Sequence, residues 1–274
     1  MPASFVSSPL DAGRVVASLG PLASRYRIEV HPAIDSTSTE LKRRGAAGPI
    51  DGLVIAAETQ TAGRGRHGRS WVDQPGGSLL FSLGWQAPVA AGSLPGLSLA
   101  VGVAACLALE RLGIARTQLK WPNDLIFRHC KLGGILVETV NPRPDSVDVV
   151  IGIGINVRLE DAARDAVSAP VTDLQAAGWS GSRSELLAAV LSELGPTLER
   201  FAREGFHPFR AAWLARHAFQ HRNVTIWSSG REIAAGRATN IDDDGALLLE
   251  TPTGIRRFVS GELTLRPDRA GEPG

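Results

Sequence analysis

Three arginines alternate with glycines in one short segment of the sequence, GRGRHGR at residues 63–69. Arg64, Arg66 and Arg69 carry guanidinium groups, which bind phosphate or carboxylate through two parallel hydrogen bonds. Glycines have no side chain, so they let backbone amides approach an anion closely. The pattern therefore predicts a loop that binds anions. Taken by itself, it fits a mobile basic surface loop or an RNA-binding patch about as well.

The same loop also fits G-x-G-x-x-G, the glycine fingerprint of dinucleotide-binding folds. That fingerprint should open directly into a helix, whereas here Pro75, Gly76 and Gly77 follow and lead into a predicted strand. A protein-kinase loop is disfavoured because HRD and DFG are absent downstream, and no G-K-S or G-K-T is present for a Walker A site. The loop therefore predicts neither a Rossmann fold nor a kinase.

A second polar cluster is LKWPNDLIF, at residues 119–127. Lys120, Asn123 and Asp124 surround a Trp-Pro pair, and proline restricts the residue before it to extended backbone. The alternative is an ordinary hairpin corner in which Asn and Asp are turn residues. The cluster is a candidate site only in combination with others.

Two further clusters pair glycines with a polar residue. In KLGGILVE, Lys131 begins a predicted strand beside two glycines, although a lone lysine in that position more often faces solvent. In IGIGINV, Gly152 and Gly154 share one face of a strand that Asn156 ends. Glycines in strands often mark close approach by a ligand, and tight sheet packing is the alternative.

Length and composition limit the classes of protein that these residues can serve. A chain of 274 residues allows one main domain and a smaller one. Its 43% hydrophobic and 21% charged residues are typical of globular proteins, and a net charge of +1 gives no reason to expect a nucleic-acid or membrane-surface partner. Two cysteines form no disulfide framework, no signal peptide is evident, and no apolar run is long enough to span a bilayer. We therefore expect a cytoplasmic protein.

The elements that must position these clusters alternate between helix and strand. Thr37 and Glu40 have the spacing of a capping box, so we expect a helix from Thr37 to a stop at Gly45. A nearly continuous apolar run at 148–157 predicts a central buried strand. Periodicity predicts further strands at 27–31, 53–58, 78–85, 118–121, 124–127 and 133–140, and helices at 10–19, 97–112, 184–203 and 207–215.

The pattern of apolar and turn residues in the sequence changes near Asn223. Beyond that residue, short apolar segments separated by turns such as DDDG and TPTG indicate a small antiparallel barrel of about five strands. We therefore predict two domains, at residues 1–221 and 222–268.

Five segments, DSTSTE, GRGRHGRSW, KWPNDL, KLGGILVE and IGIGIN, follow one another as in the biotin protein ligase family, which this chain resembles. The resemblance covers residues 34–157 in motif detail. It implies an α+β fold: a mixed β-sheet catalytic domain flanked by helices, similar to class II synthetases, with a small C-terminal SH3-like barrel. It also implies an enzyme that makes biotinyl-5'-AMP from biotin and ATP with Mg²⁺, and then biotinylates a lysine of a biotin carboxyl carrier protein.

The resemblance assigns roles residue by residue. Catalysis is expected from Lys131, Arg66 and Asp124. The biotin pocket is expected to include Ser36, Thr37, Gln60, Gly63, Arg64, Arg66, Lys131, Gly134 and Gly152. ATP contacts are expected from Arg66, Arg69, Trp71, Lys120, Asn123, Lys131 and Asn156. Asp124 is assigned to Mg²⁺ or to the incoming lysine, and no structural metal is expected.

Two alternatives and one departure accompany this interpretation. A lipoate or octanoate transferring enzyme has a related fold, but its RRxxGGGxVxHD pattern is absent. A non-catalytic biotin sensor or nucleic-acid-binding protein could use the arginine loop for phosphates. Family members that also repress transcription carry a winged helix, and the stretch before Ser36 is about half as long as that needs. We expect no repressor activity, no nucleic-acid or membrane partner, and a monomer or weak homodimer.

Overall fold

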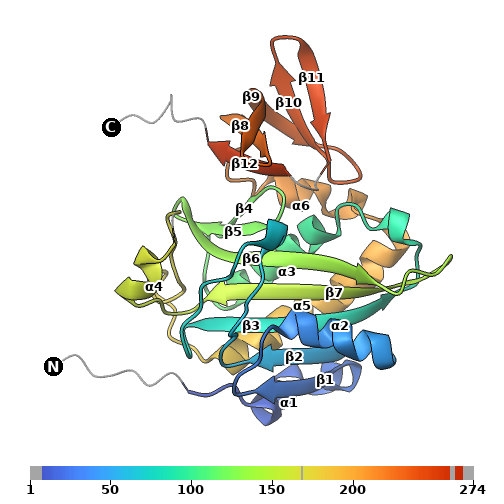
Figure 1. The fold of residues 1–274 in the computed structure, drawn as a ribbon, viewed down its shortest axis with the longest axis vertical. Coiled ribbons are helices and arrows are strands. Elements are labelled where there is room, and N and C mark those ends of the chain that lie inside the picture. Colours follow the sequence, from blue (N-terminus) through green and yellow to red (C-terminus); the bar gives the residue numbers. More distant parts are fainter. Residues whose placement is uncertain (1–7, 168, 260–262, 268–274) are drawn as a thin grey trace.

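The computed structural model describes residues 8–167, 169–259 and 263–267. Within these ranges, seven strands form a mixed sheet in the order β1-β2-β3-β7-β6-β5-β4, and a second sheet lies beyond one edge of it (Figure 1). Only β1 and β2 run parallel, and the other neighbouring pairs in the seven-stranded sheet are antiparallel. The strands are β1 (Arg27–His31), β2 (Leu53–Ala57), β3 (Ser78–Ala87), β4 (Gln118–Lys120), β5 (Asp124–Phe127), β6 (Cys130–Val140) and β7 (Val147–Asn156).

β7 occupies the centre of this sheet, and all its residues are buried, as the apolar run predicted. Its odd-numbered isoleucines face the main core, where Ile151, Ile153 and Ile155 pack against helices. Gly152 and Gly154 lie on the opposite face, because side chains alternate along a strand. The central strand therefore presents bare backbone on the face away from the main core.

Helices cover both faces of the sheet. α3 (Leu97–Arg111) and α5 (Arg183–Glu204) pack against one face, and α1 (Ala12–Leu19) packs against α5. α5 begins at a capping box in which Ser182 and Glu185 satisfy each other's backbone amides. The remaining helices are α4 (Asp161–Asp165), α6 (Arg210–Leu214) and the short 3₁₀ turns η1 (Gly20–Arg25), η2 (Arg66–Gly68), η3 (Ala91–Ser93) and η4 (His207–Phe209). No helix in the described ranges is both long and apolar enough to cross a membrane.

α2 (Thr37–Ala47) covers the opposite face and differs from its prediction at both ends. Its N-cap is Ser36, whose Oγ accepts from the Thr39 amide, so the predicted capping box with Thr37 was wrong by one residue. The helix also continues through Gly45 and ends at Gly48. Gly45 is buried within the helix, and a Cβ there would meet Ile50 and Val140 at ordinary contact distances of 3.5 and 3.6 Å.

The C-terminal sheet begins at Asn223 and has the order β11-β10-β9-β8-β12. Its strands are β8 (Asn223–Ser228), β9 (Arg231–Ile241), β10 (Leu247–Thr251), β11 (Gly254–Phe258) and β12 (Leu263–Pro267). All neighbouring pairs in it are antiparallel. The predicted division into residues 1–221 and 222–268 stays a prediction, and residue 268 lies outside the described residues.

The segment before the C-terminal sheet is hydrogen-bonded to the seven-stranded sheet. The Leu119 amide in β4 donates to Arg216 O (2.8 Å), and the Ala218 amide donates to Leu119 O (2.9 Å). Residues 216–218 therefore lie alongside β4 as a short parallel addition to the sheet edge. The small sheet thus lies next to the strand that leads into the Trp-Pro turn (Figure 1).

Candidate active site

One cavity of about 1680 Å³ lies between the bare face of β6 and β7, the arginine loop and the C-terminal sheet. Most of the residues singled out in the sequence line it: Ser36, Thr37, Gln60, Arg64, Arg66, Arg69, Trp71, Lys120, Asn123, Asp124, Lys131, Gly134 and Gly152. Gly63 and Asn156 are not among the described residues that line it. The cavity therefore brings together segments that are far apart in the sequence.

The arginine loop connects β2 to β3 and folds as a narrow hairpin. The Trp71 amide donates to Gly63 O (2.9 Å), and the Gly65 amide donates to Arg69 O (2.7 Å). Arg66 stands at the tip, and its guanidinium donates to Asn123 Oδ1 (3.3 Å). Burial lowers the pKa of Arg66, and the neighbouring Asp124 carboxylate opposes that change. The loop thus carries a partly desolvated cation into the cavity.

Arg64 contacts a different partner. Its guanidinium lies 3.3 Å from Glu138 Oε1, which also pairs with Lys42 Nζ at 2.8 Å. Glu138 is the carboxylate of the KLGGILVE motif, on β6. An anion in the cavity would therefore compete with Glu138 for Arg64.

Lys131 and Asp124 form the central ion pair of the cavity, with Nζ and Oδ1 2.7 Å apart. Both are partly exposed, at 34% and 19% of their side-chain areas. The Lys131 backbone is fixed because its amide donates to Pro170 O and its carbonyl accepts from the Thr172 amide, both at 2.9 Å. A positive group is thereby held in place with a carboxylate beside it, as stabilisation of developing negative charge requires.

Trp71 lies across the bare strand backbones next to Lys131, whose Nζ is 5.7 Å from the ring centroid. Gly134 and Gly154 are directly opposite one another in the β6 and β7 register. A Cβ at Gly154 would come within 2.8 Å of Trp71 Cζ2, and one at Gly134 within 3.3 Å of Trp71 Cζ3. Gly154 is therefore needed to seat the indole, with Gly134 in tight contact beside it, and the predicted ATP contact of Trp71 stays a prediction.

A chain of hydroxyl and amide groups lines the end of the cavity near α2. Gln60 Oε1 accepts from the Thr37 amide (2.7 Å) and from Thr37 Oγ1 (3.1 Å). Thr37 Oγ1 and Ser38 Oγ lie 2.8 and 2.9 Å from Ser82 Oγ. Sequence reasoning missed Ser38 and Ser82. The signal was a serine inside an apolar strand, in register with Gly152 on β7.

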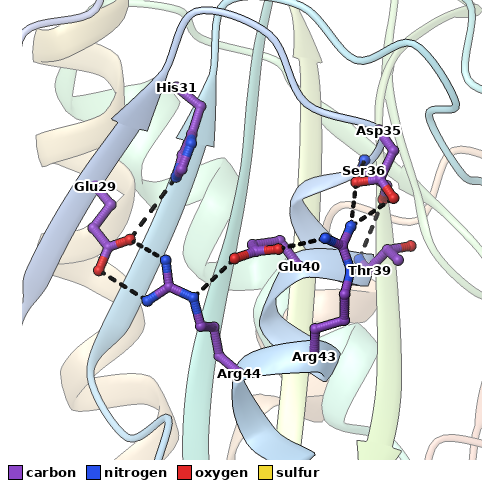
Figure 2. A network of polar contacts seen from close by, with 8 residues as sticks. All are labelled: Glu29, His31, Asp35, Ser36, Thr39, Glu40, Arg43 and Arg44. Atoms are coloured by element: carbon purple, nitrogen blue, oxygen red, sulfur yellow. Dashed lines mark hydrogen bonds and ion pairs between the residues drawn. The ribbon is translucent and has the colours of Figure 1, made fainter. Parts of the chain in front are cut away.

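The N-terminal end of α2 is also held on its outer side by ion pairs (Figure 2). Arg43 pairs with Asp35 (2.6 Å) and Glu40 (2.8 Å), while Arg44 pairs with Glu40 (2.8 Å) and Glu29 on β1 (2.9 Å). Each of these pairs contributes little by itself, because water and salt screen charges at the surface. Together they connect the first turns of α2 to the edge of the sheet, and so restrict the position of the hydroxyl-bearing end.

The predicted corner of LKWPNDLIF is tied to β6. Asn123 Nδ2 donates to Ile135 O (2.8 Å), and the Ile135 amide donates to Asn123 O (2.9 Å). Burial lowers the pKa of Lys120, whose ammonium also lies near other cations, among them Lys131 and Arg266. The corner is therefore fixed while its charged groups face the cavity.

Residues of the C-terminal sheet complete the wall, and sequence reasoning assigned none of them. They include Asn223, Thr225, Trp227, Glu232 and Arg266. The Arg266 guanidinium stacks over the Trp227 ring at 4.2 Å. No local sequence pattern predicts that these residues line the cavity, because they reach it only through the docking of one sheet against the other.

Asn156, predicted to contact the nucleotide, is bonded within the protein. It is only 5% exposed, and its Nδ2 donates to Thr172 O (3.0 Å) while its carbonyl accepts from the Leu174 amide (3.0 Å). These bonds hold the segment that passes Lys131. The assignments of Asn156 and Gly63 to direct ligand contact stay predictions.

The described residues contain no group of three or more His, Cys, Asp or Glu side chains that could hold a metal ion. Magnesium is commonly bound through substrate phosphates and one or two carboxylates. Asp124 is the carboxylate beside Lys131, and its ion pair with that ammonium disfavours it as a metal ligand. The assignment of Mg²⁺ to Asp124 stays a prediction.

Asp73 is a half-buried carboxyl at the base of the arginine loop, and its Oδ2 accepts from the Gln60 amide (3.3 Å). Burial raises the pKa of Asp73 from 3.8 to about 6, against the hydrogen bonds it accepts and the charge of Arg183. Because the folded-state pKa is the higher one, the folded protein binds the proton more tightly than the unfolded chain does. The stability from this group is therefore present below about pH 4 and lost as the pH rises through about 6.

We expect Asp73→Asn to flatten this dependence. Its free energy of unfolding should fall less than that of the wild type between pH 4 and pH 6, because the amide does not ionise. Urea unfolding at several pH values measures both curves. Parallel curves for the two proteins would contradict the raised pKa.

Two family models match the chain. The one described as "Biotin/lipoate A/B protein ligase family" matches residues 30–156, and "Biotin protein ligase C terminal domain" matches residues 222–266. The "Bifunctional ligase/repressor BirA" of Salmonella typhimurium is 36% identical over 258 residues, which cover 94% of this chain and 78% of that protein. The chain belongs to the biotin protein ligase family.

Other members agree in sequence and in fold. The biotin–acetyl-CoA-carboxylase ligase of Mycobacterium tuberculosis is 34% identical over 250 residues, covering 88% of this chain and 90% of that one. The structure of the biotin protein ligase of Aquifex aeolicus in complex with biotin and ATP has a TM-score of 0.74 and 29% identity, covering 88% of this chain and 99% of that chain. The predicted fold class is confirmed, and the protein is a ligase.

Proposed function

We propose that this biotin protein ligase activates biotin with ATP and transfers it to a lysine of the biotin carboxyl carrier domain of acetyl-CoA carboxylase or a related carboxylase. In the first step a biotin carboxylate oxygen bonds to the α-phosphorus of ATP, the bond to the β-phosphate oxygen breaks, and pyrophosphate leaves. In the second step the carrier amine attacks the acyl carbon of biotinyl-5'-AMP, and AMP leaves. The observation that carries the proposal is the Lys131–Asp124 pair beside Arg66 in one cavity.

The first step needs cations where negative charge accumulates. The α-phosphate and the biotin carboxylate both carry negative charge, so they repel each other as they approach. Lys131 and Arg66 line the same cavity and supply two positive groups for this contact. Preorganised donors of this kind commonly contribute most of the rate enhancement in such reactions.

Biotin fits the polar end of the cavity near α2. Its ureido ring has both donors and acceptors. The Thr37 and Ser38 hydroxyls and the Gln60 amide, which line the cavity, offer both as well, and the buried Ser82 hydroxyl holds the two hydroxyls from behind. The carboxylate end would then reach toward Lys131. This direction places the reacting group beside the cations and not beside the hydroxyls.

The second step needs a neutral amine. A free lysine has a pKa of about 10.4, so only about one in 10³ is neutral at pH 7.4. Asp124 is the carboxylate nearest Lys131 in the cavity, and it can accept a hydrogen bond from the entering amine once ligands change the pairing. We assign Asp124 to orienting that amine or to accepting its proton.

We expect Asp124→Asn to slow transfer from preformed biotinyl-5'-AMP about tenfold, because a charge-assisted hydrogen bond becomes a neutral one. The measurement is single-turnover biotinylation of an apo carrier domain. An exposed carboxylate outside the cavity, Asp11, serves as the control in Asp11→Asn. Transfer by Asp124→Asn at the wild-type rate would remove Asp124 from this role.

The proposal as a whole is tested by mixing the protein with biotin, ATP, Mg²⁺ and an apo carrier domain and measuring the mass of the carrier. We expect an increase of one biotinyl group that requires ATP. The match of residues 222–266 to the biotin ligase C-terminal domain supports biotin over lipoate, and a parallel reaction with lipoate compares the two acids. No mass increase with biotin would overturn the proposal.

The proposal extends to location and oligomeric state. We propose a cytoplasmic location, where carrier domains of carboxylases are made, and a monomer or weak homodimer. The absence of repressor activity stays a prediction, and footprinting on operator DNA tests it.

A further inference from the structure

The turn between β9 and β10 extends from the C-terminal sheet into the catalytic domain. At its end, Gly245 O accepts a hydrogen bond of 3.1 Å from Trp121 Nε1. Trp121 is only 1% exposed, so this bond is shielded from water. It joins the barrel to the residue that precedes the Pro122–Asn123–Asp124 corner.

The position of Gly245 is set by close packing. Its φ of +82° is in the left-handed region, and a Cβ there would come within 2.7 Å of Gly96 Cα, at the N-cap of α3. The turn is also closed internally, because the Asp242 amide donates to Ala246 O (2.8 Å). Arg257 on β11 pairs with both Asp242 and Asp244. The acceptor of the Trp121 bond therefore belongs to a rigid turn that fits against one place on the catalytic domain.

The corner on the other side of Trp121 is held at two further points. Pro122 O accepts from Ser98 Oγ (3.1 Å), and Asn123 exchanges two hydrogen bonds with Ile135. From the corner, Asp124 then reaches Lys131 and Asn123 reaches Arg66. Of these three attachments, the bond to Gly245 is the one that comes from the C-terminal sheet.

We propose that Trp121 is a positioning residue through which the C-terminal barrel fixes the Asn123–Asp124 corner, and thereby Lys131 and Arg66. This inference rests on the proposed function. The barrel then acts on the chemistry through the backbone of the corner, in addition to lining the cavity. The hydrogen bonds of Thr37 and Gln60 do not involve this corner, so we expect binding of the biotin ring system to be independent of the Trp121 bond.

The test is Trp121→Phe, which keeps an aromatic ring and removes the indole donor. We expect kcat for biotinyl-5'-AMP formation to fall about tenfold, since small misplacements of reacting groups are costly, while the KM for biotin stays unchanged. Hydrogen exchange should be faster in residues 121–127. Trp85→Phe, in a partly buried tryptophan on β3 away from the corner, should keep wild-type values in all three measurements.

A second variant acts from the barrel side and leaves the core intact. Arg257→Gln weakens the closure of the turn at a side chain that is 44% exposed, so the protein should fold. We expect a smaller loss of kcat, of about two- to threefold, and no further loss when it is combined with Trp121→Phe, because both act through one contact. If the fold losses of kcat in Arg257→Gln and Trp121→Phe multiplied in the double variant, the proposal would be overturned.

The outcomes separate the two proposals. A wild-type protein that makes no biotinyl-5'-AMP would overturn the proposed function, and hydrogen exchange at residues 121–127 still decides the positioning role. Unchanged exchange in Trp121→Phe would overturn that role whatever the activity. A wild type that is active, with unchanged kcat in folded Trp121→Phe, would overturn it while leaving the proposed function in place.

Discussion

Lys131→Ala is expected to lower the rate of biotinyl-5'-AMP formation by about 10² to 10³, the usual result of removing one preorganised donor from a developing negative charge. Two effects add up in this variant. The ammonium that faces the reacting carboxylate and phosphate is lost, and Asp124 is left beside them without its partner at 2.7 Å. A carboxylate without a cation repels both reactants. Pyrophosphate release in a single turnover measures the step.

Two comparisons make the Lys131 result specific. Lys42 pairs with Glu138 outside the cavity lining, and Lys42→Gln should change the rate by no more than about twofold, as expected for a partly exposed ion pair. In the double variant Lys131→Ala with Asp124→Ala, the rate of biotinyl-5'-AMP formation should fall by less than the product of the two single-variant factors, since the unpaired carboxylate is gone. An unchanged rate in Lys131→Ala would remove Lys131 from the site.

Arg183→Met is expected to lower the free energy of unfolding by about 3 to 5 kcal/mol, the range for breaking a buried ion pair. Arg183, the first residue of α5, is 2% exposed and lies 2.5 Å from Glu58 Oε2, just beyond β2. It also donates to Ser78 O, at the start of β3. Its loss leaves Glu58, at 23% exposure, without a cation. Urea unfolding measures the effect.

The matched control is Arg25→Met. Arg25 also pairs with a glutamate at 2.5 Å, but Arg25 and Glu199 are 42% and 53% exposed, so the expected loss is below about 1 kcal/mol. Adding Glu58→Gln to Arg183→Met should recover part of the stability, because the uncompensated charge is removed. Equal losses in Arg183→Met and Arg25→Met would show that burial does not govern this pair.

The sequence predicted those parts of the fold that leave a local pattern. The apolar run of β7 required burial on both faces, and the strand is central and fully buried. The glycines at 152 and 154 indicated close approach, and at Gly154 the structure shows the Trp71 ring in that space. The separation of Lys131 and Asp124 in the sequence did not by itself predict that their side chains are in contact. The resemblance to a family brought them together, and they lie on paired strands.

Other parts depended on tertiary contacts that no local pattern carries. The capping box was placed on Thr37 because its spacing to Glu40 fits, but the Thr37 side chain bonds to Gln60 and Ser82, so Ser36 caps the helix. Ser82 is fully buried behind the pocket, where its register with Gly152 on β7 places it against the Thr37 and Ser38 hydroxyls. The barrel residues that line the cavity depend on how two sheets dock, which sequence periodicity does not encode.

The pairing of residues 216–218 with β4 has a consequence for how this enzyme can be recombined with its relatives. A chimaera joined at residue 221 would exchange the whole C-terminal sheet. Residues 216–218, which pair with β4, would then come from one parent, and the C-terminal sheet beside them from the other. The turn at Gly245 and the helix start at Gly96 would then come from different parents, although they pack so closely that a Cβ at Gly245 would come within 2.7 Å of Gly96 Cα. Functional crossovers should therefore carry the N-terminal turn of α3 together with the barrel, so that the two are inherited as one unit despite the distance between them in the sequence.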